Sequence, residues 1–184
     1  MFSSAIAFAV ALFTSAPTLL PYADADNFDQ AVAMIAVEIR VIDESRLYCA
    51  HEVEKGKRAF DHYALYWESQ NGDEILAVET HLGRRSDRAR FESLRDAAVS
   101  AAMVGFRAAA AAAGSEKLCS ATFQSIQTGD RNVANQTPKA SQFLKSYLRR
   151  NPPAQEGVNF RNDVMGYEKQ LSNVMPVDGR RRLM

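Results

Sequence analysis

Apolar residues recur at helical spacing from residue 28 to about residue 130. In residues 28–44 the large apolar side chains stand three or four positions apart, which places them on one face of a helix. They are Phe28, Val32, Ile35, Ile39 and Ile42. The pattern continues to residue 54, and no stretch of comparable length alternates apolar and polar residues as a half-buried strand would. A long first helix is therefore predicted over residues 28–54.

Four further helices are predicted from the same spacing and from the glycines between them. Glycine weakens a helix interior and is common just after a helix ends. Ser86 and Ser115 are good N-caps, because a serine hydroxyl accepts a hydrogen bond from a free backbone N–H. The predicted helices cover residues 58–70, 73–82, 86–113 and 115–128. We therefore expect an all-α bundle of four or five helices.

The first 25 residues have the layout of a secretory signal. An unbroken apolar run at residues 5–13 is followed by the small-x-small triplet Ala23-Asp24-Ala25, which predicts cleavage after Ala25. The run is shorter than the roughly 20 apolar residues of a transmembrane helix. No basic residue precedes it, unlike a typical signal, so an uncleaved anchor or a misassigned start stays open. The expected localisation is periplasmic or secreted, with no transmembrane span in the mature chain.

The two cysteines support export. Cys49 and Cys119 form one pair with no remainder, and in an oxidising compartment such a pair usually bridges. In the cytosol they would instead be two buried thiols. Their separation of 70 residues is unlike a CxxC motif or the local clusters of zinc sites. We therefore predict a disulfide that links the first helix of the bundle to the fifth.

Charge divides the chain where composition changes. The 184 residues carry 22 basic and 22 acidic side chains, so the overall charge does not indicate nucleic-acid binding. Residues 26–130 have a net charge of −5 and residues 131–184 a net charge of +6. The predicted organisation is a signal peptide at 1–25, a helical bundle domain at 26–130 and a basic, partly disordered C-terminal tail at 131–184.

The tail contains one amphipathic segment, residues 139–150. Its apolar face consists of Phe143, Leu144, Tyr147 and Leu148. A basic amphipathic helix can lie on an anionic membrane or pack on its own acidic core. We expect docking on the core, with Lys145 and Arg149 turned away and residues 151–184 mostly mobile. The basic residues that could then bind an acidic partner are Lys145, Arg149, Arg150, Arg180, Arg181 and Arg182.

The aromatic residues of the second predicted helix fit a core stripe better than a ligand site. Phe60, Tyr63 and Trp67 share one face, whereas Tyr66 lies off that line and is expected to be exposed, as a candidate partner contact. The six alanines at residues 108–113 allow close approach of helices and bring little specific chemistry.

No catalytic motif is present. The sequence lacks G-x-S-x-G, phosphate loops, CxxCH and HExxH. His51 and His62 are 11 residues apart and would share a face on one continuous helix, but Gly56 lies between them. A metal ion would need a third ligand such as Glu54 or Glu68. We therefore expect no catalytic residue and no cofactor.

One resemblance covers roughly residues 45–130. Cys49, the segment Tyr63-x-x-Tyr66-Trp67 with Asn71 after it, and the segment that begins at Cys119 carry it. In these features the chain resembles small exported helical two-cysteine proteins of proteobacteria, which are themselves largely uncharacterised. The resemblance implies a compartment and a fold but no reaction.

The function expected from the sequence is partner binding by a non-catalytic periplasmic or secreted helical protein, its partner an unidentified envelope or extracellular protein. Two alternatives stay open. One is an envelope metal-binding protein or hydrolase that uses His51 and His62. The other is a surface protein that binds anionic lipid or polysaccharide through the basic tail.

Overall fold

The computed structural model describes residues 24–53 and 57–153, and these residues form helices without any strand. The helices are α1 (Phe28–Glu52), α2 (Lys57–Gln70), α3 (Gly72–Leu82), α4 (Arg88–Ala113), α5 (Ser115–Gln127), α6 (Val133–Gln136) and α7 (Pro138–Arg150). The all-α prediction is confirmed, and the first five helices match the predicted ones closely.

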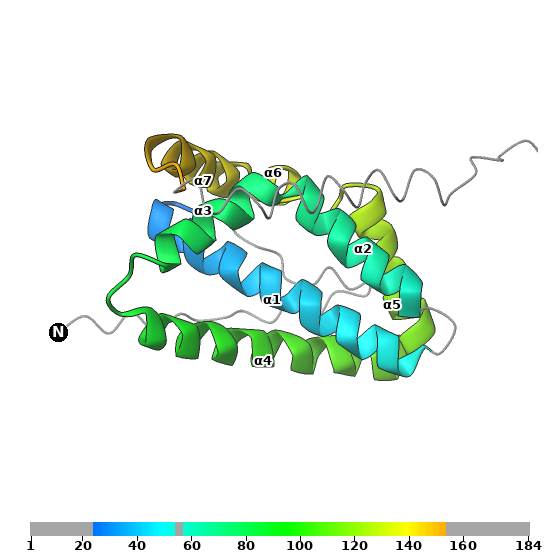
Figure 1. Ribbon diagram of the computed structural model, residues 1–184. Coiled ribbons are helices and arrows are strands. Elements are labelled where there is room, and N and C mark those ends of the chain that lie inside the picture. Colours follow the sequence, from blue (N-terminus) through cyan, green and yellow to red (C-terminus); the bar gives the residue numbers. More distant parts are fainter. Residues whose placement is uncertain (1–23, 54–56, 154–184) are drawn as a thin grey trace, which may run out of the picture.

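Helix α1 runs through the middle of the fold (Figure 1) and contacts α2, α3, α4, α5 and α7. It can do so because its buried residues are spread over most of its circumference, so that it is apolar toward several neighbours at once. They are Ala31, Val32, Ile35, Ala36, Glu38, Val41, Ile42, Ser45 and Cys49. Helix α4 lies along one side of α1, and α2 and α3 lie along the other.

The aromatic stripe of α2 lies in the core, as predicted. Trp67 is fully buried, and Phe60 is 5% exposed. The rings of Phe60 and Tyr63 pack on Phe123 of α5, with centroids 5.0 and 5.8 Å away. These contacts join α2 to α5 at the end of the bundle that the disulfide also closes.

Two predicted N-cap positions were wrong by one residue each. Helix α4 begins at Arg88 with Asp87, not Ser86, at the N-cap position. The Asp87 carboxylate accepts hydrogen bonds from Arg85 instead of capping the helix. Ser115 is the first residue of α5 rather than its cap, since Gly114 with φ of 91° makes the turn between α4 and α5. Glycine reaches this positive φ without steric cost.

The amphipathic helix of the predicted tail docks on the bundle. Helix α7 packs on α1 and α3, with Ala140 and Leu144 fully buried. The ring of Tyr147 stacks on Phe28 at the start of α1, with centroids 4.7 Å apart. Arg131 is also buried, so the boundary predicted after residue 130 falls inside the packed region. Residues 154–184 lie outside the described part of the chain.

Asp24 caps α7 from the far end of the sequence. Its carboxylate oxygens accept hydrogen bonds from the backbone N–H groups of Lys139 (2.9 Å) and Ala140 (3.1 Å). Burial acts to raise the pKa of Asp24, but hydrogen bonds from these N–H groups and that of Ala25 hold the pKa below its ordinary value. Ala25 is itself fully buried. Cleavage after Ala25 would therefore remove two residues that the fold uses.

A chain that begins at Asp24 is expected to melt at a higher temperature than one that begins at Asp26. The helix cap alone contributes about 1 kcal/mol, and the burial of Ala25 adds to it. Asp24→Ala in the longer chain should reproduce the part due to the cap, while Asp26→Ala, at an exposed position, serves as the control. Equal melting temperatures for the two chains in thermal unfolding would contradict this role of Asp24.

Candidate functional site

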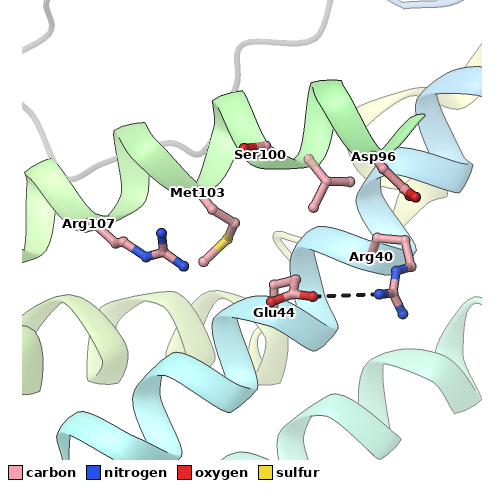
Figure 2. A pocket seen from close by; sticks show the side chains of 7 residues that line it. Arg40, Glu44, Asp96, Ser100, Met103 and Arg107 are labelled. Carbon is pink, nitrogen blue, oxygen red and sulfur yellow. Dashed lines mark ion pairs between the residues drawn. The ribbon is translucent and has the colours of Figure 1, made fainter. Parts of the chain in front are cut away.

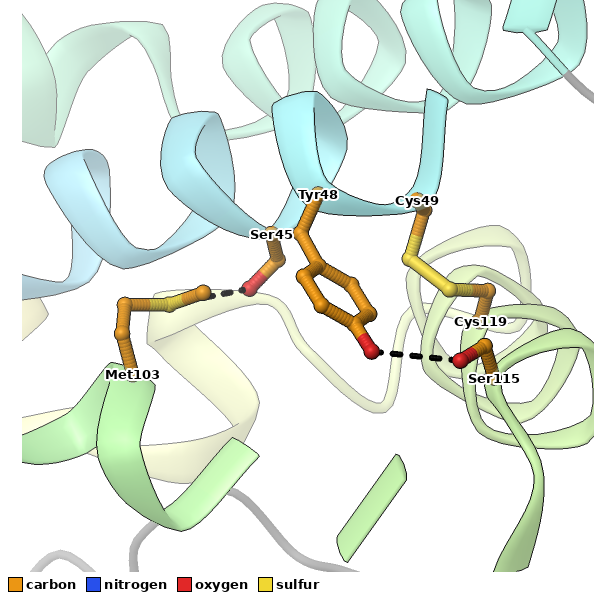
Figure 3. The surroundings of a disulfide bond; sticks show 6 residues. All are labelled: Ser45, Tyr48, Cys49, Met103, Ser115 and Cys119. Atoms are coloured by element: carbon orange, nitrogen blue, oxygen red, sulfur yellow. Dashed lines mark hydrogen bonds between the residues drawn. A yellow bond between two sulfur atoms is a disulfide. The ribbon is translucent and has the colours of Figure 1, made fainter. Parts of the chain in front are cut away.

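The predicted disulfide is present between Cys49 of α1 and Cys119 of α5, with Cα atoms 5.8 Å apart. Figure 3 shows its surroundings, in which Tyr48 and Ser115 share a hydrogen bond of 3.1 Å between their hydroxyls. Both cysteines are fully buried. A bridge that solvent thiols cannot reach stabilises the fold and is unsuited to thiol exchange.

Among the described residues, the histidines proposed as metal ligands are not assembled into a site. His51, at the end of α1, is 84% exposed, and its ring lies 2.9 Å from the carboxylate of the neighbouring Glu52. His62 is half-buried in α2 beside the ring of Tyr63. Within residues 24–53 and 57–153, no group of three His, Cys, Asp or Glu side chains is placed to hold a metal ion. Glu54, one suggested third ligand, lies outside these residues.

Lys145 is not turned away from the bundle as predicted. Its ammonium group lies 2.9 Å from a carboxylate oxygen of Glu74, whose side chain is 3% exposed. The Ser141 hydroxyl donates to the same oxygen at 2.5 Å. A carboxylate placed in an apolar core needs such partners, because isolated burial of the charge is costly. Through this ion pair Lys145 connects α7 to α3, and it is not free to bind an acidic partner.

The other proposed partner contacts are on the surface or outside the described residues. Arg149 and Arg150 are exposed and bond to Ser146 one turn earlier in α7. Tyr66 is 37% exposed on α2, consistent with its place off the core stripe. Arg180, Arg181 and Arg182 lie outside the described part of the chain.

A buried polar network connects α1, α2 and the segment before α6, and sequence reasoning missed it. The Arg131 guanidinium donates to the Glu38 carboxylate, and both side chains are almost fully buried. The Trp67 indole N–H donates to the Arg131 carbonyl at 2.8 Å. Asn71 accepts from the Val133 N–H at 2.8 Å and donates to the Trp67 carbonyl at 2.7 Å. The network holds residues 131–133 on the core and is closed to a substrate.

His81 occupies an aromatic pocket between α1 and α7. Its ring makes edge contacts with Phe28 (4.9 Å between centroids) and Tyr147 (5.5 Å). Burial lowers the pKa of His81, and the positive charge of Arg85 lowers it further. Asp29, 4.0 Å away, acts in the opposite direction. The fold therefore favours the neutral imidazole.

Acidification is expected to destabilise the protein through His81. Because the native pKa lies below the ordinary value of 6.5, the unfolded state takes up the proton first. The contribution of His81 to stability is complete above that value and is lost as the pH falls through the lowered native pKa. The melting temperature of His81→Gln should therefore fall less between pH 7.5 and pH 5.5 than that of the unchanged protein.

Two carboxyl groups, those of Glu68 and Glu79, act in the opposite sense in the same experiment. Burial raises the pKa of Glu68 and Glu79, so their contribution decreases as the pH rises through their native values. The comparison with His81→Gln isolates the histidine. His51→Gln is the matched control, since the His51 side chain is 84% exposed. An unchanged pH profile for His81→Gln would remove His81 as the cause.

The side of α4 that points away from α1 exposes apolar residues to solvent. Leu94 and Val104 are 64% and 62% exposed there. At 100° per residue they fall within one sector of the helix, about 120° wide, together with small exposed residues. These are Ala97, Ala101, Gly105, Ala108, Ala111 and Ala112. We call these eight residues the outer face of α4. The solvent side of a helix is normally polar, and this one carries no charge over five turns.

Most of the alanines at residues 108–113 do not serve the internal packing that the sequence suggested. Only Ala110 among residues 108–113 is buried in the core. Helix α4 packs against α1 and α5 through Val99, Met103, Phe106 and Ala110. Most of its small residues are left in contact with solvent, which is a surface that another helix can approach closely.

A shallow groove of about 240 Å³ borders the outer face, between α4 and α1. Figure 2 shows Asp96 and Arg107 on α4 and Arg40 and Glu44 on α1 around it. Arg40 and Glu44 are 3.5 Å apart, so charges of both signs face the groove and balance. Ser100 also lines it, but the lining contains no histidine that could act as its base.

Among the described residues α4 is also the helix long and apolar enough to cross a membrane by length and composition. Its inner face is occupied by the bundle, however. Inserting the helix into lipid would separate Met103 and Phe106 from the core, where they are 3% and 0% exposed. It would also bury Asp96 and Arg107, at about 2.5–3.5 kcal/mol for each charge near the bilayer centre. The packing of α4 in the bundle therefore argues against its insertion into a membrane.

The residues described above define the class of this protein as an all-α, disulfide-linked bundle with an exposed apolar helix face. Comparison with known proteins finds no matching family, no similar curated protein and no similar solved structure.

Proposed function

We propose that the protein is a non-catalytic, exported helical module that acts by binding a protein partner through the outer face of α4. The exposure of Leu94 and Val104 on the uncharged outer face of α4 carries this proposal. Large exposed apolar patches mark interaction sites, because a soluble protein otherwise gains nothing from leaving them in water.

Two further observations support the proposal. The buried disulfide fits an oxidising compartment, in agreement with the export signal expected from residues 1–25. The buried carboxylate of Glu74 is paired within the bundle by Ser141 and Lys145. The outer face of α4, by contrast, makes no packing contact that buries it within the described part of the protomer.

Photo-cross-linking in cells that export the protein tests this function. A photoreactive residue at Val104 should form adducts with a specific protein. The same residue at Leu65 of α2, which is 42% exposed but outside the outer face, is the control and should not. Leu94→Asn combined with Val104→Asn should abolish the adduct formed from position 101 without lowering the melting temperature. Equal cross-linking from positions 104 and 65 would argue against α4 as the binding surface.

A further inference from the structure

We propose that four exposed arginines at one end of the bundle form a surface that binds the anionic lipids of a membrane. They are Arg84 in the turn after α3, Arg90 in the first turn of α4, and Arg149 and Arg150 at the end of α7. We call them the arginine surface. It shares no residue with the outer face of α4 and does not depend on the function proposed above.

Segments that are distant in the sequence form the arginine surface. Arg84 donates to the side-chain oxygen of Asn151 at 2.9 Å, which joins the turn after α3 to the residue that follows α7. Arg149 and Arg150 directly precede Asn151, and α4 begins four residues after Arg84. The end of α7, the turn between α3 and α4, and the start of α4 accordingly lie at the same end of the bundle (Figure 1).

None of the four guanidinium groups forms an ion pair within the described residues. Arg84 hydrogen-bonds a neutral asparagine, and Arg149 and Arg150 hydrogen-bond the neutral Ser146. Arg90 has no side-chain hydrogen bond in the same part of the chain. A guanidinium group has five N–H donors, so each of the four retains donors and its full charge for an anion.

Carboxylates at this end of the bundle are neutralised by two other arginines. Arg85 pairs with Asp87 at 2.7 Å and lies 3.9 Å from Asp29. Arg88 pairs with Glu92 at 2.7 Å. Because these pairs balance their own charges, the positive charge of this end comes from the arginine surface.

The charge of the described residues is unevenly distributed. Outside this end acidic side chains outnumber basic ones, mainly on the second half of α1, on α2 and on α3. Asp26, just before α1, lowers the charge of the arginine end by one and does not cancel the four arginines. An extended anionic plane attracts that end and repels the acidic remainder, so it also orients the bundle. An acidic peptide or a small anion interacts only with the side chains that it touches, and the distribution therefore favours a membrane surface.

Arginine suits the phosphate groups of lipids, because its planar guanidinium can donate two parallel hydrogen bonds to one phosphate. Each basic residue near an anionic bilayer strengthens binding about fivefold. The four arginines together then strengthen it by several hundredfold, on the order of 600-fold. Such binding is peripheral and reversible, and it leaves α4 packed in the bundle. It weakens with salt, because the Debye length is only about 8 Å at physiological ionic strength.

Co-sedimentation with vesicles tests this surface on the full chain purified from cells that export it. The protein should bind vesicles of phosphatidylglycerol and phosphatidylcholine in equal parts far more strongly than vesicles of phosphatidylcholine alone. Arg84→Gln combined with Arg90→Gln should weaken binding about 25-fold, the effect of two charges. Both positions are exposed, so the melting temperature should change little.

Two variants that lose charge elsewhere are the controls. Arg40→Gln combined with Arg107→Gln removes two charges from the groove between α1 and α4, and vesicle binding should change little. Replacement of Arg180, Arg181 and Arg182 by glutamine removes three charges from C-terminal residues outside the described part of the chain, and most of the binding should remain. Loss of binding in this C-terminal variant, with none in the double variant of the arginine surface, would overturn the assignment.

Two further results would also overturn it. Equal binding to both kinds of vesicle would show that the anionic lipid is not recognised. Capture of polyglutamate by the arginine surface, without binding to the mixed vesicles, would identify an acidic protein as the partner instead. Support for the membrane role requires that binding to the mixed vesicles decreases with added sodium chloride and with the substitutions at positions 84 and 90.

Discussion

Replacement of Glu38 by leucine is expected to lower the free energy of unfolding by about 3–5 kcal/mol. The substitution leaves the guanidinium of Arg131, whose side chain is 6% exposed, without the carboxylate to which it donates. The ε nitrogen of Arg131 already has no hydrogen-bond partner among the described residues. A buried charge that loses its counter-ion retains its full desolvation cost, which explains the size of the effect.

The double variant Glu38→Leu with Arg131→Met is the control for this first prediction. It removes both charges and should recover much of the lost stability, since a buried ion pair often contributes little more than apolar residues of similar volume. Urea denaturation of both variants measures the difference. A double variant no more stable than Glu38→Leu would show that the cost comes from packing rather than from an unpaired charge.

Replacement of both Cys49 and Cys119 by serine should lower the free energy of unfolding by about 4 kcal/mol. The bridge closes a loop of 70 residues, and its loss restores chain entropy to the unfolded state. For a chain of this size the melting temperature should fall on the order of 10 °C. The helical content at low temperature should change little, because the native packing around both positions remains.

Thiol titration provides the check on this second prediction. The unfolded but unreduced protein should show no free thiol, and reduction should lower its melting temperature about as far as the double serine substitution does. Two free thiols in the unreduced protein would contradict the bridge. An unaltered melting temperature in the serine variant would show instead that the bridge is present but adds no stability.

The helices and the disulfide could be predicted from the sequence because their causes are local or countable. The three- and four-residue spacing of Val32, Ile35 and Ile39 depends only on the helical repeat. The turns at Gly83 and Gly114 follow from the weakness of glycine in helix interiors. Two cysteines leave a single possible pairing within the chain.

The docking of α7 was anticipated from its amphipathic pattern, but the role of Lys145 was not. Spacing along α7 identifies the side that carries Leu144 as apolar, and it leaves Lys145 beside that side. That Glu74 of α3 lies within 2.9 Å of the Lys145 ammonium group depends on how two helices cross. The same holds for Asp24, which caps a helix that starts more than a hundred residues later.

The sequence by itself determined the helical class, the order and approximate bounds of five helices, the disulfide and the core aromatic stripe, since these follow from periodicity and composition. The tertiary structure alone decided which face of α4 is left in solvent and which polar residues pair in the core. Both faces of α4 are rich in apolar residues, so its periodicity cannot distinguish the inner side of Met103 and Phe106 from the outer side of Leu94 and Val104. The pair of Glu38 and Arg131 could not be predicted either, because contacts between residues distant in sequence are set by packing in three dimensions.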